Sequence, residues 1–293
     1  MVWLIGNKGM LGSEVESFLV SNKVPFICSD LEVDITDENS LRSYIEFKDK
    51  KIEWVVNCSA YTAVDQAEEE PEKAFKVNSN GVFNLTKMAK TLNAVLIHIS
   101  TDYVFDGNKQ SAYLENDVPN PVGVYGKSKW QGDQHIIRDL NSYFIFRTAW
   151  LYGKNGKNFA NTMLKLFEKR ETVRVVSDQW GSPTYAKGLA EMIVDLVRNR
   201  RTEYGIYHYS NLGRINWYDF AKKIHEIALR EGIIHKNVEL VPITTAEYPT
   251  KATRPLNSCL SKEKIMKTFG LSIRSWEDAL EEYITEEVRE CEN

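Results

Sequence analysis

Residues 2–12 read Val2-Trp3-Leu4-Ile5-Gly6-Asn7-Lys8-Gly9-Met10-Leu11-Gly12, an apolar run that passes directly into a glycine-rich turn. The glycines have the spacing G-x-x-G-x-x-G. Small residues at such a turn let backbone N–H groups approach a pyrophosphate at the positive end of the following helix. The stretch therefore predicts the first strand, the phosphate-binding turn and the first helix of a dinucleotide-binding sheet. A tight turn that binds no ligand is the alternative.

Short apolar runs alternate with longer amphipathic stretches through the first half of the chain. We expect strands at residues 2–5, 25–29, 54–58, 95–99 and 143–147, and helices at 12–20, 38–47, 71–92 and 126–140. Strands that alternate with helices in this way are typical of a parallel sheet with right-handed crossovers. The sequence therefore predicts an α/β fold with a Rossmann-type doubly wound sheet.

The regularity loosens after Trp150. Here we expect helices at residues 159–169, 185–200, 217–230 and 276–290, and strands at 173–176 and 206–209. This pattern predicts a smaller, mixed α/β portion beside the sheet. We assign residues 1–150 and about 181–205 to the cofactor-binding Rossmann domain, and 151–180 and 206–293 to a substrate-binding portion.

Composition excludes several classes of protein. With 293 residues and 43% hydrophobic content, the chain can bury a substantial core. The net charge of -4 gives no general electrostatic reason to bind nucleic acid or a membrane surface. No apolar run approaches the roughly 20 residues that a membrane helix needs. We therefore expect neither nucleic acid nor a membrane as a partner.

The cysteines and histidines indicate the compartment and the absence of a metal centre. The cysteines form no C-x-x-C pair, and the chain shows no signal-peptide layout, so we expect a reducing cytoplasm. The histidines lack ligand spacing, so we expect no transition-metal site built by the protein. These residues are Cys28, Cys58, Cys259 and Cys291, and His98, His135, His208, His225 and His235.

Asp30 ends the second expected strand, about 20 residues after the glycine turn. A carboxylate at this place accepts hydrogen bonds from the adenosine ribose of a dinucleotide. It favours NADH over NADPH because it repels a 2′-phosphate, although the positive charge of Lys8, in the glycine turn, offsets part of that repulsion. A turn or cap residue is the alternative reading of Asp30.

Further candidate cofactor contacts follow the second and third strands, at the carboxyl edge where a bound adenine and its phosphates pass. They are Asp34, Ile35, Ala60, Tyr61 and Thr62. Asn78 lies inside an expected helix, where asparagine has poor propensity, so we expect its side chain to have a specific polar role. A solvent-facing helix residue is the alternative for Asn78.

The fourth strand runs into Ser100-Thr101-Asp102, and Tyr125 and Lys129 follow on a helix. Residues four apart on a helix lie on one face, so the ammonium of Lys129 can act on the phenol of Tyr125. A free tyrosine has a pKa near ~10 and needs a neighbouring positive charge to exchange protons readily. This pattern predicts hydride transfer from a nicotinamide to a ketone, with Tyr125 donating the proton and Thr101 orienting the carbonyl. An exposed helical pair is the alternative.

These motifs carry a resemblance to a known family. The chain resembles the dTDP-4-dehydrorhamnose reductases, which are extended short-chain reductases. The matching segments span nearly the whole chain in order: residues 57–65 (NCSAYTAVD), 100–107 (STDYVFDG), 125–129 (YGKSK), 147–153 (RTAWLYG), 158–159 (NF), 178–184 (DQWGSPT) and 254–258 (RPLNS).

The resemblance implies NADPH- or NADH-dependent reduction of the 4-keto group of a dTDP-4-keto-6-deoxy sugar, dTDP-4-dehydro-L-rhamnose. Thr101, Tyr125 and Lys129 match the catalytic residues. The candidate cofactor contacts are Gly6, Gly9, Met10, Leu11, Gly12, Asp30, Asp34, Ile35, Ala60, Tyr61, Thr62, Asn78, Tyr125 and Lys129. The candidate substrate contacts are Thr101, Asp102, Val104, Trp150, Asn158 and Arg254.

Trp150 and Arg254 also have physical reasons to contact a nucleotide sugar. An indole ring provides a flat wall for a deoxysugar, although tryptophan is more often simply buried. The guanidinium of Arg254 can engage two phosphate oxygens of a diphosphate, with a surface ion pair as the alternative.

The chain departs from the family pattern at two places. Tyr61 stands where the family commonly has histidine before Thr62, which changes the cofactor pocket without abolishing it. Some members dimerise through a divalent cation held by carboxylates. Glu14 matches one such ligand, but Lys187 occupies the place of another. We therefore expect a monomer or a weak homodimer without that cation.

Related functions are separated by single residues. Nucleotide-sugar dehydratases usually carry Thr-Asp-Glu, whereas this chain has Tyr103 in place of the glutamate. Epimerases share the Tyr-x-x-x-Lys pair and hold NAD permanently. Some relatives are regulatory binding subunits that have lost their active site, and the intact Thr101, Tyr125 and Lys129 argue against that class. Ketone reduction is the function that these residues favour.

Overall fold

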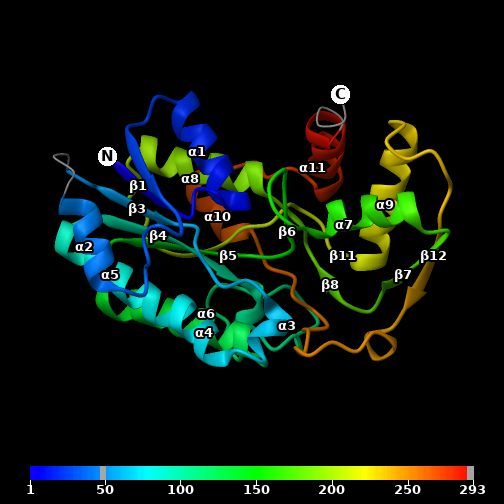
Figure 1. The fold of residues 1–293 in the computed structure, drawn as a ribbon, viewed down its shortest axis with the longest axis horizontal. Coiled ribbons are helices and arrows are strands. Elements are labelled where there is room, and N and C mark those ends of the chain that lie inside the picture. Colours follow the sequence, from blue (N-terminus) through cyan, green and yellow to red (C-terminus); the bar gives the residue numbers. More distant parts are fainter. Residues whose placement is uncertain (47–50, 289–293) are drawn as a thin grey trace.

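A six-stranded parallel sheet forms the centre of the larger part of the molecule, in the order β10-β5-β4-β3-β1-β2. The computed structural model describes residues 1–46 and 51–288 (Figure 1). The strands of the sheet are β1 (Val2–Ile5), β2 (Phe26–Ser29), β3 (Trp54–Asn57), β4 (Val95–Thr101), β5 (Tyr143–Thr148) and β10 (Gly205–His208). The order reverses between β1 and β3, and this switch point opens a crevice at the carboxyl ends of the two strands.

Helices cover both faces of the sheet (Figure 1). Side chains alternate along β1, so that Val2 and Leu4 pack in one core and Trp3 and Ile5 in the other. The first core lies against α1 (Met10–Ser21) and α8 (Ala186–Arg198). The second lies against α2 (Glu38–Glu46), α5 (Val82–Leu92) and α6 (Val124–Asp139). The prediction of a doubly wound α/β sheet is confirmed.

One expected helix, residues 71–92, contains a π-helical segment. The chain runs through α4 (Pro71–Phe75), a π segment (Lys76–Gly81) and α5 without leaving the helix. A π segment widens the helix by one residue per turn and occurs frequently at functional sites. Here it carries Asn78, and Gly132 of α6 packs so closely that an added Cβ would lie 2.3 Å from the Asn78 carbonyl oxygen.

The smaller part has a core of its own, formed by residues such as Tyr152, Phe167 and Phe220. It lies at the right of Figure 1. Its elements pair as β7 with β12 and as β8 with β11, while β6 pairs with β9. They are β6 (Leu151–Tyr152), α7 (Phe159–Lys169), β7 (Thr172–Val176), β8 (Trp180–Gly181), β9 (Thr184–Tyr185), β11 (Ile215–Asn216), α9 (Trp217–Arg230), β12 (Glu239–Ile243) and α11 (Trp276–Glu282), followed by a π segment (Tyr283–Val288).

The short elements are α3 (Val64–Ala67), α10 (Glu263–Phe269) and 3₁₀ turns at Asp102–Val104 and Thr245–Glu247. They are too short for sequence periodicity to reveal, and the two-residue strands of the smaller part were missed for the same reason.

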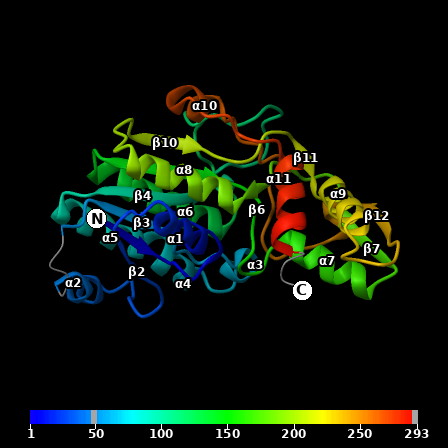
Figure 2. The same cartoon turned by 90° about the horizontal axis from the view of Figure 1, so that it is seen from above.

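The placement of one strand corrects the predicted division of the chain. The strand expected at 206–209 exists as β10, but it pairs with β5 at the edge of the main sheet (Figure 2). Ile265 and Phe269 of α10 pack in the same core. Assigning these segments to the substrate-binding portion was therefore wrong. Residue 47 of the helix expected at 38–47 and residues 289–290 of the helix expected at 276–290 lie outside the described residues.

Candidate active site

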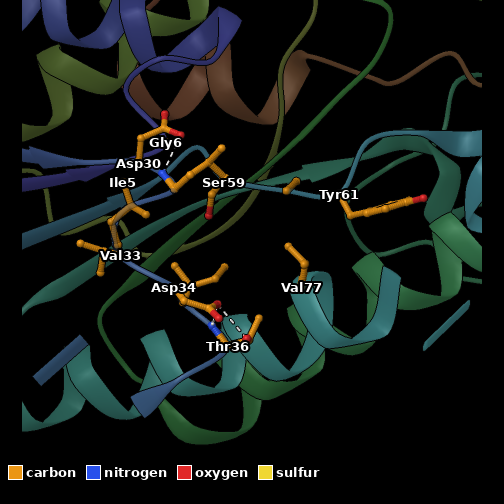
Figure 3. A pocket seen from close by; sticks show the side chains of 12 residues that line it. Ile5, Gly6, Asp30, Val33, Asp34, Thr36, Ser59, Tyr61 and Val77 are labelled. Atoms are coloured by element: carbon orange, nitrogen blue, oxygen red, sulfur yellow. Dashed lines mark hydrogen bonds between the residues drawn. The ribbon is translucent and has the colours of Figure 1, made fainter. Parts of the chain in front are cut away.

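A cavity of about 460 Å³ lies at the switch point of the sheet. Figure 3 shows the side chains that converge on it from the ends of β1, β2 and β3. It is lined by Ile5, Gly6, Asp30, Leu31, Val33, Asp34, Ile35, Thr36, Ser59, Ala60, Tyr61 and Val77. Six of the predicted cofactor contacts are among these residues, whereas Thr62 is not. The position and shape suit the adenosine half of a dinucleotide.

The glycine turn has the geometry of a phosphate cradle. Gly6 has φ +79°, and an added Cβ at Gly12 would lie 1.9 Å from the Gly6 carbonyl oxygen, so only glycine fits at these two positions. Gly9 is the N-cap of α1, and no side chain caps the first turn of the helix. The N–H groups of this turn, which includes Met10 and Leu11, are therefore available to a pyrophosphate.

Asp30 is fixed at the end of β2 beside this cradle. Its carboxylate accepts hydrogen bonds from the backbone N–H groups of Lys8 at 2.9 Å and Leu31 at 2.8 Å. The glycine turn therefore holds Asp30 through a backbone group of Lys8. Asp30 lines the cavity.

Asp34 lines the same cavity but uses its carboxylate locally. Oδ1 accepts hydrogen bonds from the Thr36 hydroxyl at 2.7 Å and the Thr36 N–H at 2.8 Å. These bonds lower the pKa of Asp34, the hydroxyl contributing most. Asp34 and Ile35 therefore shape the wall of the cavity.

Asn78 organises the loop that carries Ala60, Tyr61 and Thr62. Its side chain accepts a hydrogen bond from the Tyr61 N–H at 2.8 Å and donates to the Tyr61 carbonyl and the Ser128 hydroxyl, both at 3.0 Å. Asn78 is only 1% exposed, so the expectation of a specific polar role fits and the solvent-facing alternative does not. The Asn78 side chain therefore joins the loop to α6.

Thr101 and Tyr125 meet at the carboxyl end of β4. The Thr101 hydroxyl donates to Asp102 at 3.0 Å and accepts from the Tyr103 N–H at 3.2 Å. Burial raises the pKa of Tyr125 to about 12, and a hydrogen bond with Thr101 opposes that rise. Tyr103 packs edge-on against Tyr125, with ring centroids 5.7 Å apart. The phenol thus stays protonated at neutral pH, which a proton donor requires.

Lys129 is buried one helical turn after Tyr125, at 1% exposure. Its ammonium donates to the Ile99 carbonyl at 2.6 Å and lies 3.4 Å from Nε2 of His98. Burial lowers the pKa of Lys129 to about 8, while Asp133 acts in the opposite direction. The predicted exposed-pair alternative does not fit, because Lys129 is buried and Tyr125 is half-buried.

One carboxylate oxygen of Asp102 can accept a hydrogen bond from a bound molecule. The residue is 2% exposed, and Oδ2 has no hydrogen-bond partner within the described part of the chain. Burial raises the pKa of Asp102 to about 6, and hydrogen bonds with Ser258 and Thr101 oppose the rise. A buried acceptor left open next to Thr101 suits a substrate hydroxyl.

Trp150 is held in a left-handed backbone conformation, with φ +49°. Its indole stacks on Trp217, with ring centroids 3.5 Å apart and planes 11° from parallel. Gly181 lies beneath the ring, and an added Cβ there would lie 2.5 Å from it. A bulky residue in this conformation stores strain, which persists only where the surroundings enforce it. The indole is therefore presented in one fixed orientation.

Three predicted substrate contacts have structural partners of their own. Val104 is completely buried in a small core. Asn158 caps α7 by accepting from the Asn161 N–H at 2.9 Å. Arg254 forms a two-pronged pair with Asp65 at 2.7 and 2.9 Å. The guanidinium that was expected to clamp a diphosphate is thus engaged with a carboxylate.

Sequence reasoning missed His98, Asp133, Arg147, Trp217 and Asp65. Asp133 stands four residues after Lys129, so helical spacing alone places both on one face. The others come from segments that are distant from Lys129 in sequence, and no local pattern predicts them.

No group of three or more His, Cys, Asp or Glu side chains suited to a metal ion occurs among the described residues. Lys187 and Glu14 line one surface pocket, and Lys187 pairs with Glu282 at 2.5 Å and Glu286 at 3.5 Å. In residues 1–46 and 51–288, no helix combines the length and apolar character that a membrane crossing requires.

The fold and the site define the class first: a Rossmann-type reductase that uses a nicotinamide cofactor. The family model "RmlD substrate binding domain" matches residues 1–289. The chain belongs to this family, and the resemblance to dTDP-4-dehydrorhamnose reductases is confirmed.

Two curated relatives and one solved structure illustrate the similarity. The dTDP-4-dehydrorhamnose reductase of Aggregatibacter actinomycetemcomitans is 40% identical over 285 residues, covering 94% of this chain and 96% of the relative. A dTDP-4-keto-6-deoxy-D-glucose reductase of Streptomyces niveus is 39% identical over 223 residues, covering 75% and 76%. The dTDP-4-dehydrorhamnose reductase of Bacillus anthracis, solved in complex with NADP, has a TM-score of 0.90 at 36% identity, covering 97% and 98%.

Proposed function

We propose that this chain reduces the 4-keto group of dTDP-4-dehydro-L-rhamnose to give dTDP-L-rhamnose, with NADPH or NADH as reductant. The observation that carries this function is the contact of buried Thr101 with half-buried Tyr125, with Lys129 buried one turn further along α6. Membership of the family and 40% identity to a dTDP-4-dehydrorhamnose reductase support the same activity.

The cradle at Gly6, Gly9 and Gly12 and the cavity beside Asp30 fit a dinucleotide, which supplies a hydride when bound. The side chains of the protein orient the ketone oxygen and deliver a proton to it. Tyr125 enters the reaction protonated because burial raises its pKa. Thr101 is positioned to orient the substrate oxygen toward that phenol, and the charge of Lys129 favours release of the phenolic proton.

Tyr103 separates reduction from dehydration. It occupies the position at which a dehydratase has glutamate, and desolvation is the main cause that raises the pKa of its phenol. A protonated phenol cannot serve as the base of an elimination at neutral pH. The site thus has one proton donor suited to a ketone, Tyr125, and lacks the acid pair of the dehydratases.

For the substrate we assign Asp102 to a sugar hydroxyl and Trp150 to the face of the deoxysugar. Arg254 remains our candidate for the diphosphate, where it would exchange the carboxylate of Asp65 for phosphate oxygens. The chain acts on a nucleotide sugar in the cytoplasm, as a monomer or a weak homodimer.

A second candidate substrate follows from the relative in Streptomyces niveus, which is described as a dTDP-4-keto-6-deoxy-D-glucose reductase. The two reactions share the ketone chemistry and differ in the configuration of the sugar. The same residues can catalyse both reductions, and the contacts with the sugar ring decide which of the two substrates is bound.

The experiment mixes purified protein with NADPH or NADH and each 4-keto-6-deoxy sugar, and follows the loss of nicotinamide absorbance. We expect turnover with a dTDP sugar and weaker turnover with UDP and GDP analogues. Absence of turnover, under conditions in which an authentic reductase works, would contradict the function. Cofactor that survives extensive dialysis would instead indicate an epimerase.

A further inference from the structure

A cluster of buried polar side chains lies beside Lys129, and the reaction described above leaves its members without a task. The cluster consists of His98 and Ser100 from β4, Asp133 from α6 and Arg147 from β5, and none is more than 3% exposed. Burying an ion costs several kcal/mol unless its partners compensate. We therefore expect this buried cluster to have a specific role.

Asn57 fixes the tautomer of His98. The side-chain oxygen of Asn57 accepts hydrogen bonds from the hydroxyl and N–H of Ser59 at 2.6 and 3.0 Å, which sets the orientation of its amide. The Asn57 NH₂ group therefore donates to Nδ1 of His98 at 3.0 Å. Burial holds the pKa of His98 well below its usual value, so the ring is neutral and carries its proton on Nε2.

Nε2 of His98 lies between Lys129 and Asp133. The Lys129 ammonium is 3.4 Å away and Oδ1 of Asp133 is 3.8 Å away. The ammonium has no lone pair, so the N–H of His98 is left to point toward Asp133. Oδ1 has no hydrogen-bond partner of its own in the described segments, whereas Oδ2 accepts from Ser100 at 2.8 Å. The carboxylate thus keeps one oxygen for the imidazole.

We propose that His98 and Asp133 are positioning residues for Lys129: the Nε2–H of His98 faces Asp133 and fixes its carboxylate, and the negative charge of that carboxylate keeps the ammonium of Lys129 charged. This inference rests on the proposed function, in which Lys129 must carry a charge. The imidazole therefore acts on Lys129 through its contact with Asp133.

The other groups that face Lys129 leave Asp133 as its counter-charge. Burial raises the pKa of Cys58 to about 12, so that thiol is neutral. Tyr125 is also protonated, and Asp102 acts on Tyr125. Arg147 approaches the far oxygen of Asp133, with Nε 3.6 Å from Oδ2. Burial raises the pKa of Asp133, and Arg147 and Lys129 oppose that rise, which favours the charged carboxylate.

The direct test is an NMR titration of cofactor-free protein that contains lysine labelled with ¹³C next to the ammonium. The signal of Lys129 is the one absent from Lys129→Met. In the wild type we expect a midpoint near the pKa of about 8. In Asp133→Asn the midpoint should fall by about one pH unit or more, because an opposite charge is removed. An unchanged midpoint would overturn the role of Asp133.

The His98 variants test the positioning role in the same titration and in steady-state kinetics. His98→Leu should lower the midpoint and reduce kcat by roughly tenfold or more, because the carboxylate of Asp133 is no longer fixed beside the ammonium of Lys129. His98→Gln keeps a donor near the position of Nε2 and should restore both. Equal midpoints and equal kcat values for His98→Leu and His98→Gln would overturn the role of His98. If Asp133→Asn does not fold, this comparison tests the proposal by itself.

His208 supplies the matched control. It is also a buried, neutral histidine, and it acts on Arg147 from β10. His208→Gln should leave the Lys129 midpoint unchanged, even where the variant lowers thermal stability. A midpoint that falls equally in His208→Gln and Asp133→Asn would show a general effect of disturbing the core and overturn the inference. Because the titration needs no substrate, its outcome is independent of whether the proposed reductase activity is observed.

Discussion

Two regions of the molecule meet at the site and are built from different side chains. The edge of the sheet brings Thr101, Tyr125 and Lys129 together in front of buried charged side chains. The region around Trp150 consists of stacked rings, in which Trp150 lies on Trp217 and Trp217 contacts Phe159. Proton transfer needs groups fixed in a medium of low polarity, whereas sugar binding needs flat apolar area. We therefore expect damage at the sheet edge to reduce kcat and damage to the rings to raise KM.

The largest effect is expected for Tyr125→Phe, which removes the phenolic proton and keeps the ring. We expect kcat to fall on the order of 10³-fold, within the usual range for loss of a general acid. Cofactor binding, measured by fluorescence titration, should stay near the wild-type value. A variant with substantial turnover would assign proton donation to another group.

Gly12→Ala tests the cofactor side of the sheet edge. The added methyl group would lie 1.9 Å from the Gly6 carbonyl oxygen, so the turn must open. We expect cofactor affinity to fall by roughly a hundredfold, about 2.7 kcal/mol. Gly9→Ala is the matched control, since its Cβ would lie 3.3 Å from the same oxygen. Equal affinities for the two variants would contradict the cradle geometry.

The pH profile separates Lys129 from Tyr125. Lys129 loses its charge as pH rises through its pKa of about 8, whereas Tyr125 keeps its proton until its pKa of about 12. We therefore expect kcat to fall above pH 8, by about tenfold per pH unit once one proton controls the rate. A profile that stays flat to pH 10 would show that the charge of Lys129 is not required.

The smallest effect is expected in the ring region. Trp217→Leu removes the stack beneath Trp150, and such aromatic pairs contribute about 0.5–1.5 kcal/mol. Steady-state kinetics should show KM for the sugar rising by roughly twofold to tenfold, with kcat nearly unchanged. A large loss of kcat at unchanged KM would place the rings in the chemistry and remove the contrast between the two regions.

The fold was predictable from sequence where a pattern is local. The apolar run before Gly6 and the alternation that follows it predicted the strands of the sheet, because strand and helix periods differ. The strand β10 shows the limit of this approach. Its residues predicted a strand, but whether it joins the main sheet depends on contacts with β5 that lie far away in sequence.

The site shows the same division. The spacing of Tyr125 and Lys129 and the position of Thr101 after a strand predicted their proximity, because parallel strands end at one edge. The stack of Trp150 on Trp217, the ion pair of Arg254 with Asp65 and the contact of His98 with Asp133 join residues between 35 and 189 positions apart. Such pairs follow from the packing of whole elements.

Isotope transfer tests the central claim, reduction of the sugar ketone at C4, most directly. The protein is incubated with nicotinamide cofactor that carries deuterium at C4, in the transferable position, and with dTDP-4-dehydro-L-rhamnose. NMR and mass spectrometry of the product should show one deuterium bound to C4 of the 6-deoxy sugar. Cofactor oxidation without deuterium at that carbon, or deuterium at another carbon of the sugar, would contradict the proposed function.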